Sequence, residues 1–414
     1  MNPQEALLRA VPLEFELLCL TGRVEFAASA AARAAAIIAD GRLDWSGFLS
    51  RLERSYVAPL VHRNLRSLGA GSASAKVLET LRVRSKITAF KSEQFTAELV
   101  RLVKLLDSKG IRTIHYKGAV TAQEFHGSVT LRNFNDLDFL VHPCDVRAVI
   151  RLLEGEGYQN SEHLTDQQLT HYVREFKEFL FRRGEISLEP HWSLAGRRYP
   201  FDPDYDGFWS RSRLLSLRGA QLRVMSLEDS LLVLCLAGAK GRWKRLQMVT
   251  DIAACVSRFE EDDWLRIQAR AAATRTVRIL NVGLLLAREL SGAALPAEVE
   301  TRVFFDSCAW KLTRRAILCL MNGEKQSNWL PNTPAIFSGL LFQQRESFRD
   351  RFTYLWHTTT TPHLLHLQRM PLPRAAHPLY RALVPLHDFV LYPLVQLART
   401  IPRVAFAWRR QAPR

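Results

Sequence analysis

Between residues 111 and 224 the spacing of apolar residues changes from a helical to a strand-like period, and this change limits the fold more than any other feature. Before it, helical spacing runs almost unbroken from residue 4 to residue 109 and ends at Gly110, a natural helix stop. After it come short apolar or alternating runs bounded by turn residues. We therefore expect the α+β class, with a small mixed β-sheet core flanked by N-terminal and C-terminal helical regions.

The individual runs predict the order of the elements. "IRTIHY" and "DLDFLVH" are typical of buried strands with a short helix between them, and "PCDVRAVIRLLEGEGY" follows as a helix. Two hairpins are expected after it, one around Gly184 and one at "RLLSLRGAQLRVM". Ser226, with Asp229 three residues later, predicts a capped helix start.

These patterns divide the chain into four expected parts. They are an N-terminal helical region (residues 1–95), a core with the sheet (96–225), a helical domain (226–330) and a basic, proline-rich C-terminal segment (331–414).

The C-terminal segment has an unusual composition. Residues 363–414 hold eight arginines, no lysine and a single acid, Asp388, and the apolar run "FVLYPLVQLA" is too short to span a bilayer. Such a segment suits an element lying on an anionic membrane surface. Equally, it is compatible with a basic tail wrapped over the protein's own surface, and both interpretations stay open.

The net charge and the spacing of the cysteines limit the classes of function that the chain can have. A formal net charge of +16 favours an anionic partner, which leaves nucleotide phosphates, nucleic acid and a membrane surface open. The six cysteines show no zinc-like spacing, and no secretory signal or membrane span is apparent. We expect a cytoplasmic protein, with residues 363–414 as the candidate for contact with the inner membrane face.

Two carboxylates interrupt the apolar run "LRNFNDLDFLV". Asp136 and Asp138 stand two residues apart on an expected strand, so their side chains share one face and repel each other. A divalent cation relieves this repulsion, and oxygen ligands suit Mg²⁺ or Mn²⁺. The simpler alternative is that one aspartate ends the strand and the other faces solvent.

Two nearby motifs favour the metal-site interpretation. Lys117 and Gly118 lie between a strand and a helix start, where backbone amides can approach a phosphate. Glu189 and His191 repeat the two-residue spacing, and an acid in the apolar surroundings of Glu189 needs a cation. His191 is equally explained as a core histidine. Pro190 cannot donate to a ladder, so we expect an edge strand or a bulge there.

The ordered motifs resemble those of an uncharacterised bacterial nucleotidyltransferase family within the polymerase-beta-like nucleotidyltransferase superfamily, and more distantly abortive-infection toxins. The resemblance rests on Lys117-Gly118, on Arg132 followed by "NDLD", and on "LLEGEGY", "LEPHW", "SLEDSLLVL" and "AKGRWKRLQMVTDIA". It covers roughly residues 95 to 290. The second glycine or serine that is usual after the first strand is replaced by Ala119.

The resemblance implies Asp136 and Asp138 as metal ligands, with Glu189 as a third carboxylate that serves as ligand or as base. It also implies a nucleoside triphosphate substrate bound with Mg²⁺ or Mn²⁺. The expected reaction moves a nucleotidyl group to a hydroxyl of an unknown acceptor and releases pyrophosphate. A catalytically inactive nucleotide-binding or membrane-associated protein, or an enzyme that modifies RNA, remains an alternative, although a nucleic-acid partner is not favoured.

The resemblance also implies a phosphate-binding set. Lys117, Gly118, Arg132 and Lys240 would lie near the triphosphate, and Asp251 near the catalytic face. Lys240 is also explained as part of a solvated basic helix end. Asp251 lies in an apolar run and is expected to need a lysine or arginine partner.

Overall fold

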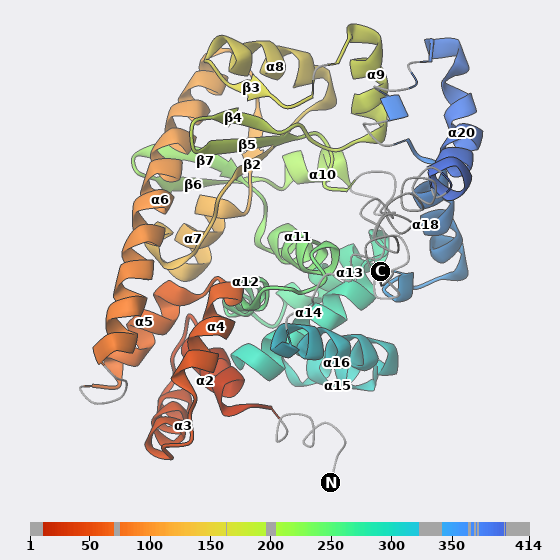
Figure 1. Ribbon diagram of the computed structural model, residues 1–414. Helices are drawn as coiled ribbons and strands as arrows, with labels where there is room; N and C mark the ends of the chain where they lie inside the picture. Colours follow the sequence, from red (N-terminus) through yellow and green to blue (C-terminus); the bar gives the residue numbers. More distant parts are fainter. Residues whose placement is uncertain are drawn as a thin grey trace, which may run out of the picture.

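A computed structural model describes most of the chain. The described residues are 11–69, 75–162, 164–195, 204–322, 342–362, 366–367, 370, 372–392 and 394. Figure 1 shows a sheet at one end of the molecule and two groups of helices at the other. The expected α+β class, with a mixed sheet flanked by helical regions, is confirmed.

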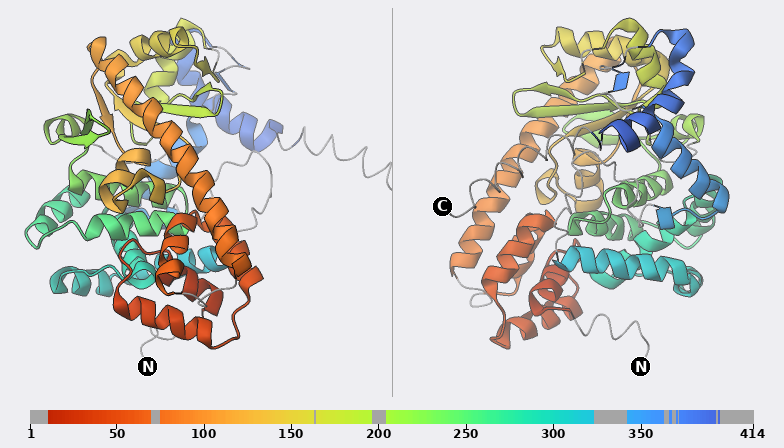
Figure 2. Two further views of the ribbon diagram at one scale, coloured as in Figure 1. Left: turned by 90° about the vertical axis from the view of Figure 1, so that its left-hand side faces the viewer. Right: turned by 45° about the vertical axis from the view of Figure 1, so that its right-hand side comes forward.

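A 34-residue helix, α6 (Ala75–Ser108), connects the two ends. It is the long amphipathic helix predicted before Gly110, and it runs from the N-terminal helices to the sheet, against which its second half packs (Figures 1 and 2). The helices before it are α2 (Leu13–Thr21), α3 (Ala28–Ala39), α4 (Trp45–Ser55) and α5 (Ala58–Ser67).

Within the described part of the chain, the sheet has seven strands in the order β3-β4-β5-β2-β1-β7-β6. The strands are β1 (Thr113–His115), β2 (Leu137–Val141), β3 (Gln159–Asn160), β4 (Phe181–Arg183), β5 (Ile186–His191), β6 (Arg213–Leu217) and β7 (Ala220–Val224). Both predicted hairpins are present, as β4 with β5 and β6 with β7. β1 pairs antiparallel with β2, whereas the parallel pairs join β2 to β5 and β1 to β7, which are distant in sequence.

Short helices connect these strands. They are α7 (Gly118–His126), η1 (Val129–Leu131), η2 (Pro143–Asp145), α8 (Val146–Gly155), α9 (Asp166–Glu175) and α10 (Tyr205–Ser210).

Pro190 does not lie on an edge strand, so the edge-strand part of that expectation is wrong. β5 is flanked by β4 on one side and β2 on the other. On the β4 side, the amide of Phe179 donates to the carbonyl of Pro190 at 3.3 Å, and β4 itself begins only at Phe181. The missing donor of Pro190 therefore falls in the gap between the regular β4–β5 ladder and the isolated bridge of Glu178 with His191, which is how an interior strand accommodates it.

The helical domain follows the sheet. Its helices are α11 (Leu227–Lys240), α12 (Leu246–Val256), α13 (Asp263–Ala273), α14 (Val277–Ser291), α15 (Ala297–Phe305) and α16 (Ser307–Asn322). Its apolar residues form one continuous core with those of α2 to α5. The sheet, α8 and most of α6 form a second core. The domain boundaries expected from the sequence stay a proposal.

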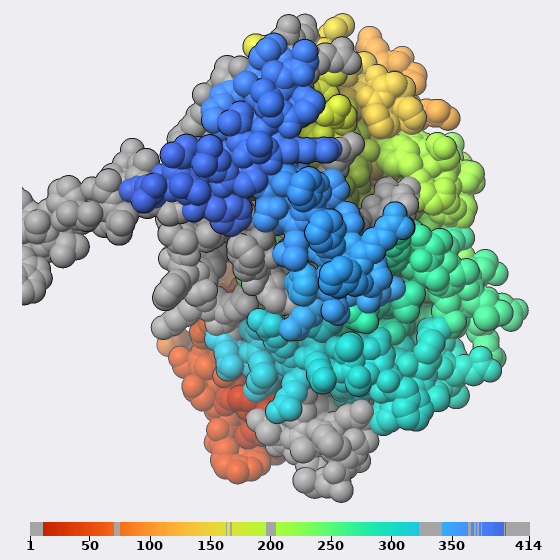
Figure 3. Space-filling model, turned by 90° about the vertical axis from the view of Figure 1, so that its right-hand side faces the viewer, coloured from red at the N-terminus to blue at the C-terminus, as the bar shows by residue number. Residues whose placement is uncertain are grey.

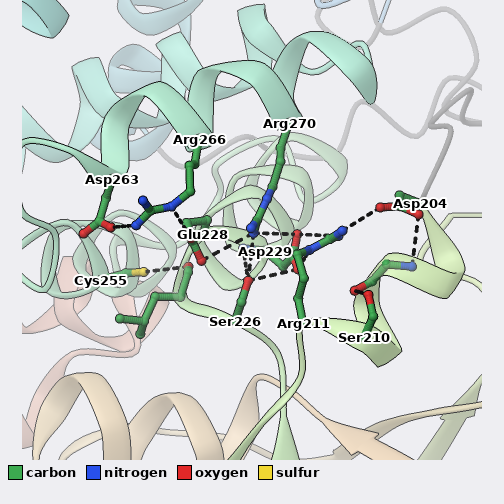
Figure 4. A network of polar contacts seen from close by, with 12 residues as sticks. Asp204, Ser210, Arg211, Ser226, Glu228, Asp229, Cys255, Asp263, Arg266 and Arg270 are labelled. Carbon is green, nitrogen blue, oxygen red and sulfur yellow. Dashed lines mark hydrogen bonds and ion pairs between the residues drawn. The ribbon is translucent and has the colours of Figure 1, made fainter.

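A polar cluster around the buried Ser226 and Asp229 lies where the sheet joins the helical domain (Figure 4). Ser226 caps α11 as predicted, because its hydroxyl accepts from the amide of Asp229. The carboxylate of Asp229 lies 3.0 Å from the Nε of Arg211 and 3.3 Å from Nη1 of Arg270. The three charged side chains tie α10, α11 and α13 together at this junction.

The described part of the C-terminal segment packs on the protein itself. It contains α18 (Phe348–Thr360), η4 (Arg374–Leu379), α20 (Tyr380–Leu386) and η5 (His387–Leu391). Figure 3 shows these elements covering one face of the molecule. Tyr380 and Val384 are buried in the core of the sheet, whereas Phe389, Val390 and Leu391 are exposed.

No helix among the described residues combines the length and apolar character needed to cross a bilayer. Half of the run "FVLYPLVQLA" lies within the described residues, whereas Pro393 and residues 395–398 lie outside them. Contact with a membrane surface through residues 363–414 stays a prediction.

Candidate functional site

The predicted carboxylates meet at one face of the sheet. Asp138 is the second residue of β2, and Asp136 lies just before that strand. In the parallel pairing of β2 with β5, Asp138 is the register partner of Glu189, so their side chains lie on the same face. The sequence-predicted triangle of Asp136, Asp138 and Glu189 is therefore brought together by one strand pair.

His191 links two of these carboxylates. Its Nε2 lies 2.9 Å from Oδ1 of Asp138 and 3.6 Å from Oε2 of Glu189. The possible ligand atoms of Asp138, Glu189 and His191 all lie within 4.8 Å of one another. On the other ring edge, Nδ1 of His191 is 3.0 Å from the carboxylate of Glu178, which was not predicted from the sequence. Because this histidine is buried between carboxylates, it orients Asp138.

The two aspartates of the site have pKa values that are shifted in opposite directions. Burial, and then the charges of Asp138 and Glu189, raise the pKa of Asp136 to about 6. Burial also opposes ionisation of Asp138, but Lys117 and His191 outweigh it and hold the pKa of Asp138 below its usual value. Nζ of Lys117 lies 3.3 Å from Oδ1 of Asp138. Asp138 is therefore held in its ionised form, whereas ionisation of Asp136 is disfavoured. A bound cation would relieve the repulsion between these carboxylates.

Three lysines face the carboxylates. Lys117 and Lys240 line the same hollow as Asp136 and Asp138. Lys240 is not a solvated helix end: its Nζ donates to the carbonyl of Leu194 at 3.0 Å. Burial, and then the charge of Lys117, lower the pKa of Lys240 to about 8.

Lys177 is the third lysine, and it was not predicted from the sequence. Burial, and then the charges of Lys240 and Lys117, lower the pKa of Lys177 to about 6. A signal was present in the run "EFKEFLF", where Lys177 occupies the same alternating face as Phe179 and Phe181, both of which are buried. A lysine on the apolar face of a period-2 run is a candidate for a buried, functional cation.

The predicted turn after β1 is backbone-strained. Lys117 precedes α7 with φ 59° and ψ −160°, a conformation that side chains other than glycine rarely adopt, and Gly118 follows with φ 46°. A Cβ added at Gly118 would lie 3.4 Å from the carbonyl oxygen of Asp136, so α7 begins directly beside the carboxylates. The N-terminus of α7 lines the hollow together with these residues. Its positive dipole end favours an anion there.

Arg132 is held by Asp251 and is not a free cation. Its Nε and Nη2 donate to the two carboxylate oxygens of Asp251, at 2.9 and 2.8 Å. Nε2 of His126 lies 2.8 Å from Oδ1 of the same carboxylate. All three residues are buried. The expectation that Asp251 needs a basic partner is confirmed, and the buried His126 is an additional partner that the sequence did not reveal.

The charge of Asp251 should make stability pH-dependent. Burial would raise the pKa of Asp251, but Arg132 and His126 outweigh it and hold the pKa at about 2. Because the unfolded value is roughly 3.9, ionised Asp251 stabilises the fold above about pH 5, and this contribution is lost as the pH falls toward 2.

We therefore expect Asp251→Asn to lower the free energy of unfolding by about 3 kcal/mol at neutral pH. The difference from the wild type should shrink steadily below pH 4 when urea denaturation is followed across the pH range. Asp40→Asn, which removes an exposed carboxylate paired with Arg42, is the control and should keep the wild-type midpoint at neutral pH. A deficit of Asp251→Asn that stays constant with pH would contradict this account.

The strain at Lys117 should be visible in a pair of variants. Lys117→Gly and Lys117→Ala both remove the ammonium group, but only glycine adopts the observed backbone angles readily. We expect the glycine variant to be more stable than the alanine variant by about 1 kcal/mol or more in urea denaturation. The same pair made at Lys109, just after α6, should favour glycine much less. Equal stability of the two Lys117 variants would show that this turn holds no strain.

Comparison with known proteins identifies the family. The model of a family described as uncharacterised nucleotidyltransferase matches residues 41–292, a range that begins earlier than the motifs indicate. No curated protein matches.

Among solved structures, the antibiotic-resistance factor ANT(2'')-Ia is 13% identical, with 44% of this chain and 93% of that chain covered and a TM-score of 0.32. An antigenic nucleotidyltransferase-like protein from Paracoccidioides brasiliensis is 16% identical, with 50% and 97% covered and a TM-score of 0.29. Both TM-scores are low, and the family assignment does not depend on these two structures. The family match spans more than half of the chain, and the protein therefore belongs to the uncharacterised nucleotidyltransferase family.

Proposed function

We propose that the protein is a metal-dependent enzyme that transfers a nucleotidyl group from a nucleoside triphosphate to an acceptor hydroxyl. The hydroxyl oxygen forms a bond to the α-phosphorus, the bond between that phosphorus and the bridging oxygen breaks, and pyrophosphate leaves with the electron pair. The observation that supports this function is the opposition, at one site, of three carboxylates and three lysines.

The carboxylates fit a divalent cation. Asp136, Asp138 and Glu189 supply the oxygen ligands that Mg²⁺ or Mn²⁺ prefers, and the raised pKa of Asp136 marks an excess of negative charge among them. When bound, such an ion neutralises charge on the phosphates and lowers the pKa of the attacking hydroxyl. His191 would act on Asp138 as a positioning residue, because it touches that carboxylate at 2.9 Å.

Glu189 is also suited to receive the proton of the acceptor. Its side chain is 28% exposed, in contrast to 4% for Asp138, so it is the more accessible of the two carboxylates to an incoming hydroxyl. A base must reach the proton that it removes. In this proposal Glu189 takes the proton from the acceptor oxygen as the new bond to phosphorus forms.

The lysines and the start of α7 would hold the triphosphate. Burial, and then the positive charges of neighbouring lysines, lower the pKa of Lys177 and of Lys240. A triphosphate among them would favour their charged forms and so bind more tightly, because opposite charges stabilise each other. The backbone around Gly118 offers amide donors at the helix N-terminus. Arg132 would contribute mainly by shaping the hollow, since its guanidinium is engaged with Asp251.

The test is a comparison of nucleotide binding in matched aspartate variants. We expect the wild type to bind at least one of ATP, GTP, CTP and UTP in isothermal titration, and to bind it more tightly with Mg²⁺ than with EDTA. In the Asp136→Asn, Asp138→Asn double variant the Mg²⁺ dependence should disappear and affinity should fall at least tenfold, because the metal ligands are lost.

Asp145→Asn is the matched control, because Asp145 follows the other end of β2 and lies outside the hollow. It should bind nucleotide as the wild type does. The proposal fails if the wild type binds no nucleoside triphosphate, or if the double variant binds it identically with the same dependence on Mg²⁺. Label transfer from an [α-³²P]-labelled nucleotide to a cell-extract acceptor then distinguishes an enzyme from an inactive nucleotide-binding protein.

A further inference from the structure

Three metal-ligating side chains converge in the C-terminal segment, away from the carboxylates of the sheet. His366 comes from the described residues 366–367, and His387 and Asp388 come from the start of η5. Nε2 of His366 lies 3.1 Å from Nδ1 of His387 and 2.9 Å from Oδ1 of Asp388. Nδ1 of His387 lies 2.8 Å from the same carboxylate oxygen. Each atom thus touches both of the others.

The triangle can be held together by protons or by a cation. If both ring nitrogens carry a hydrogen, both N–H groups can donate to Oδ1 of Asp388, which has two lone pairs. A cation beside the triangle would instead accept a lone pair from all three atoms at once, which requires both ring nitrogens to be without a hydrogen.

The separations lie close to those of a coordination sphere. Ligand atoms about 2.1 Å from an ion lie roughly 3.4 Å apart at the tetrahedral angles that Zn²⁺ favours. The three contacts of 2.8, 2.9 and 3.1 Å are shorter by a few tenths of an ångström, so small side-chain rotations would bring them to this spacing. The side chain of His366 is 4% exposed, whereas those of His387 and Asp388 are 29% and 19% exposed. The cluster therefore has one buried ligand and an open side, through which an ion can enter.

The ligand chemistry differs from that of the nucleotidyl-transfer site. Two imidazole nitrogens and one carboxylate oxygen suit a first-row transition ion such as Zn²⁺, whereas Mg²⁺ prefers oxygen. The cluster shares no residue with Asp136, Asp138 and Glu189. We propose that His366, His387 and Asp388 bind one transition-metal ion of the Zn²⁺ class, independently of the nucleotide.

An ion held there would close a loop of the C-terminal segment. The chain between His366 and His387 contains Tyr380, which is buried in the core of the sheet. The hydroxyl of Tyr380 donates to the carbonyl of Met370 at 2.6 Å and accepts from the amide of Leu372 at 3.1 Å, so the loop is already fastened inside. The metal would fasten its two ends, which limits the open conformations available to the segment.

The test is metal uptake by the full-length protein. After removal of metal with EDTA, the protein is dialysed against Zn²⁺ or Co²⁺ in the presence of excess Mg²⁺, and bound metal is measured by mass spectrometry. We expect one Zn²⁺ per chain in the wild type, and visible absorption bands when Co²⁺ replaces it. His387→Ala and Asp388→Asn, which change the two more exposed ligands, should weaken Zn²⁺ binding at least tenfold.

Two further variants separate this site from its surroundings. His377→Ala removes a histidine of the same segment that is not part of the triangle and should keep the bound Zn²⁺. Asp138→Asn should keep it as well. The proposal is overturned if the wild type takes up neither Zn²⁺ nor Co²⁺, which would leave a proton-sharing cluster. It is also overturned if Asp138→Asn loses the ion while His387→Ala retains it. Neither result bears on nucleotide binding, so this inference and the proposed function can fail separately.

Discussion

The buried ion pair between Arg132 and Asp251 is the contact on which the geometry of the site depends. Arg132 belongs to the loop that leads into β2 and its carboxylates, and Asp251 belongs to α12 in the helical domain. His126, at the end of α7, joins the same carboxylate. Gln247 adds a second tie by donating to the carbonyl of Asn133 at 2.8 Å. One acid thus fixes α7, which begins at Gly118, together with the loop before β2 and the neighbouring domain.

This arrangement explains how a hollow rich in charge can form between two apolar cores. A buried arginine that lost its carboxylate would cost several kcal/mol, so the loop has little freedom to move away from α12. With the loop fixed, Asp136 and Asp138 are held close together although they repel each other. The fold therefore supplies the energy that keeps the carboxylates close, and a cation would recover part of it on binding.

Much of the fold followed from local sequence signals. The long helix before Gly110, the two hairpins and the cap at Ser226 each depend on nearby residues, so periodicity and turn chemistry were sufficient. Alternation of side chains on strands placed Asp136 and Asp138 on one face, but only the family resemblance implied that Glu189 joins them. Which strands pair in parallel is a long-range property, and no local pattern indicated that β5 lies beside β2.

The sequence predictions that were wrong or missing also depend on contacts between residues that are distant in sequence. Pro190 indicated an edge strand or a bulge, but its strand is interior, and the residue at which β4 begins, which cannot be read from Pro190, decides how that strand tolerates a proline. The resemblance implied that Arg132 lies near the phosphates, but no local pattern indicated its partner on α12, which is 119 residues away in sequence. Lys177 was missed because its importance comes from Lys117 and Lys240, which approach it from other elements.

The central claim is that the three carboxylates hold the metal while the lysines and the start of α7 hold the triphosphate. A crystal structure with Mn²⁺ and a non-hydrolysable nucleoside triphosphate, recorded with anomalous scattering from manganese, tests this most directly. The account predicts at least one manganese peak within bonding distance of Asp136 or Asp138, with phosphate oxygens beside Lys117 and the amides near Gly118. Manganese and triphosphate bound together elsewhere on the protein, with the hollow unchanged, would contradict it.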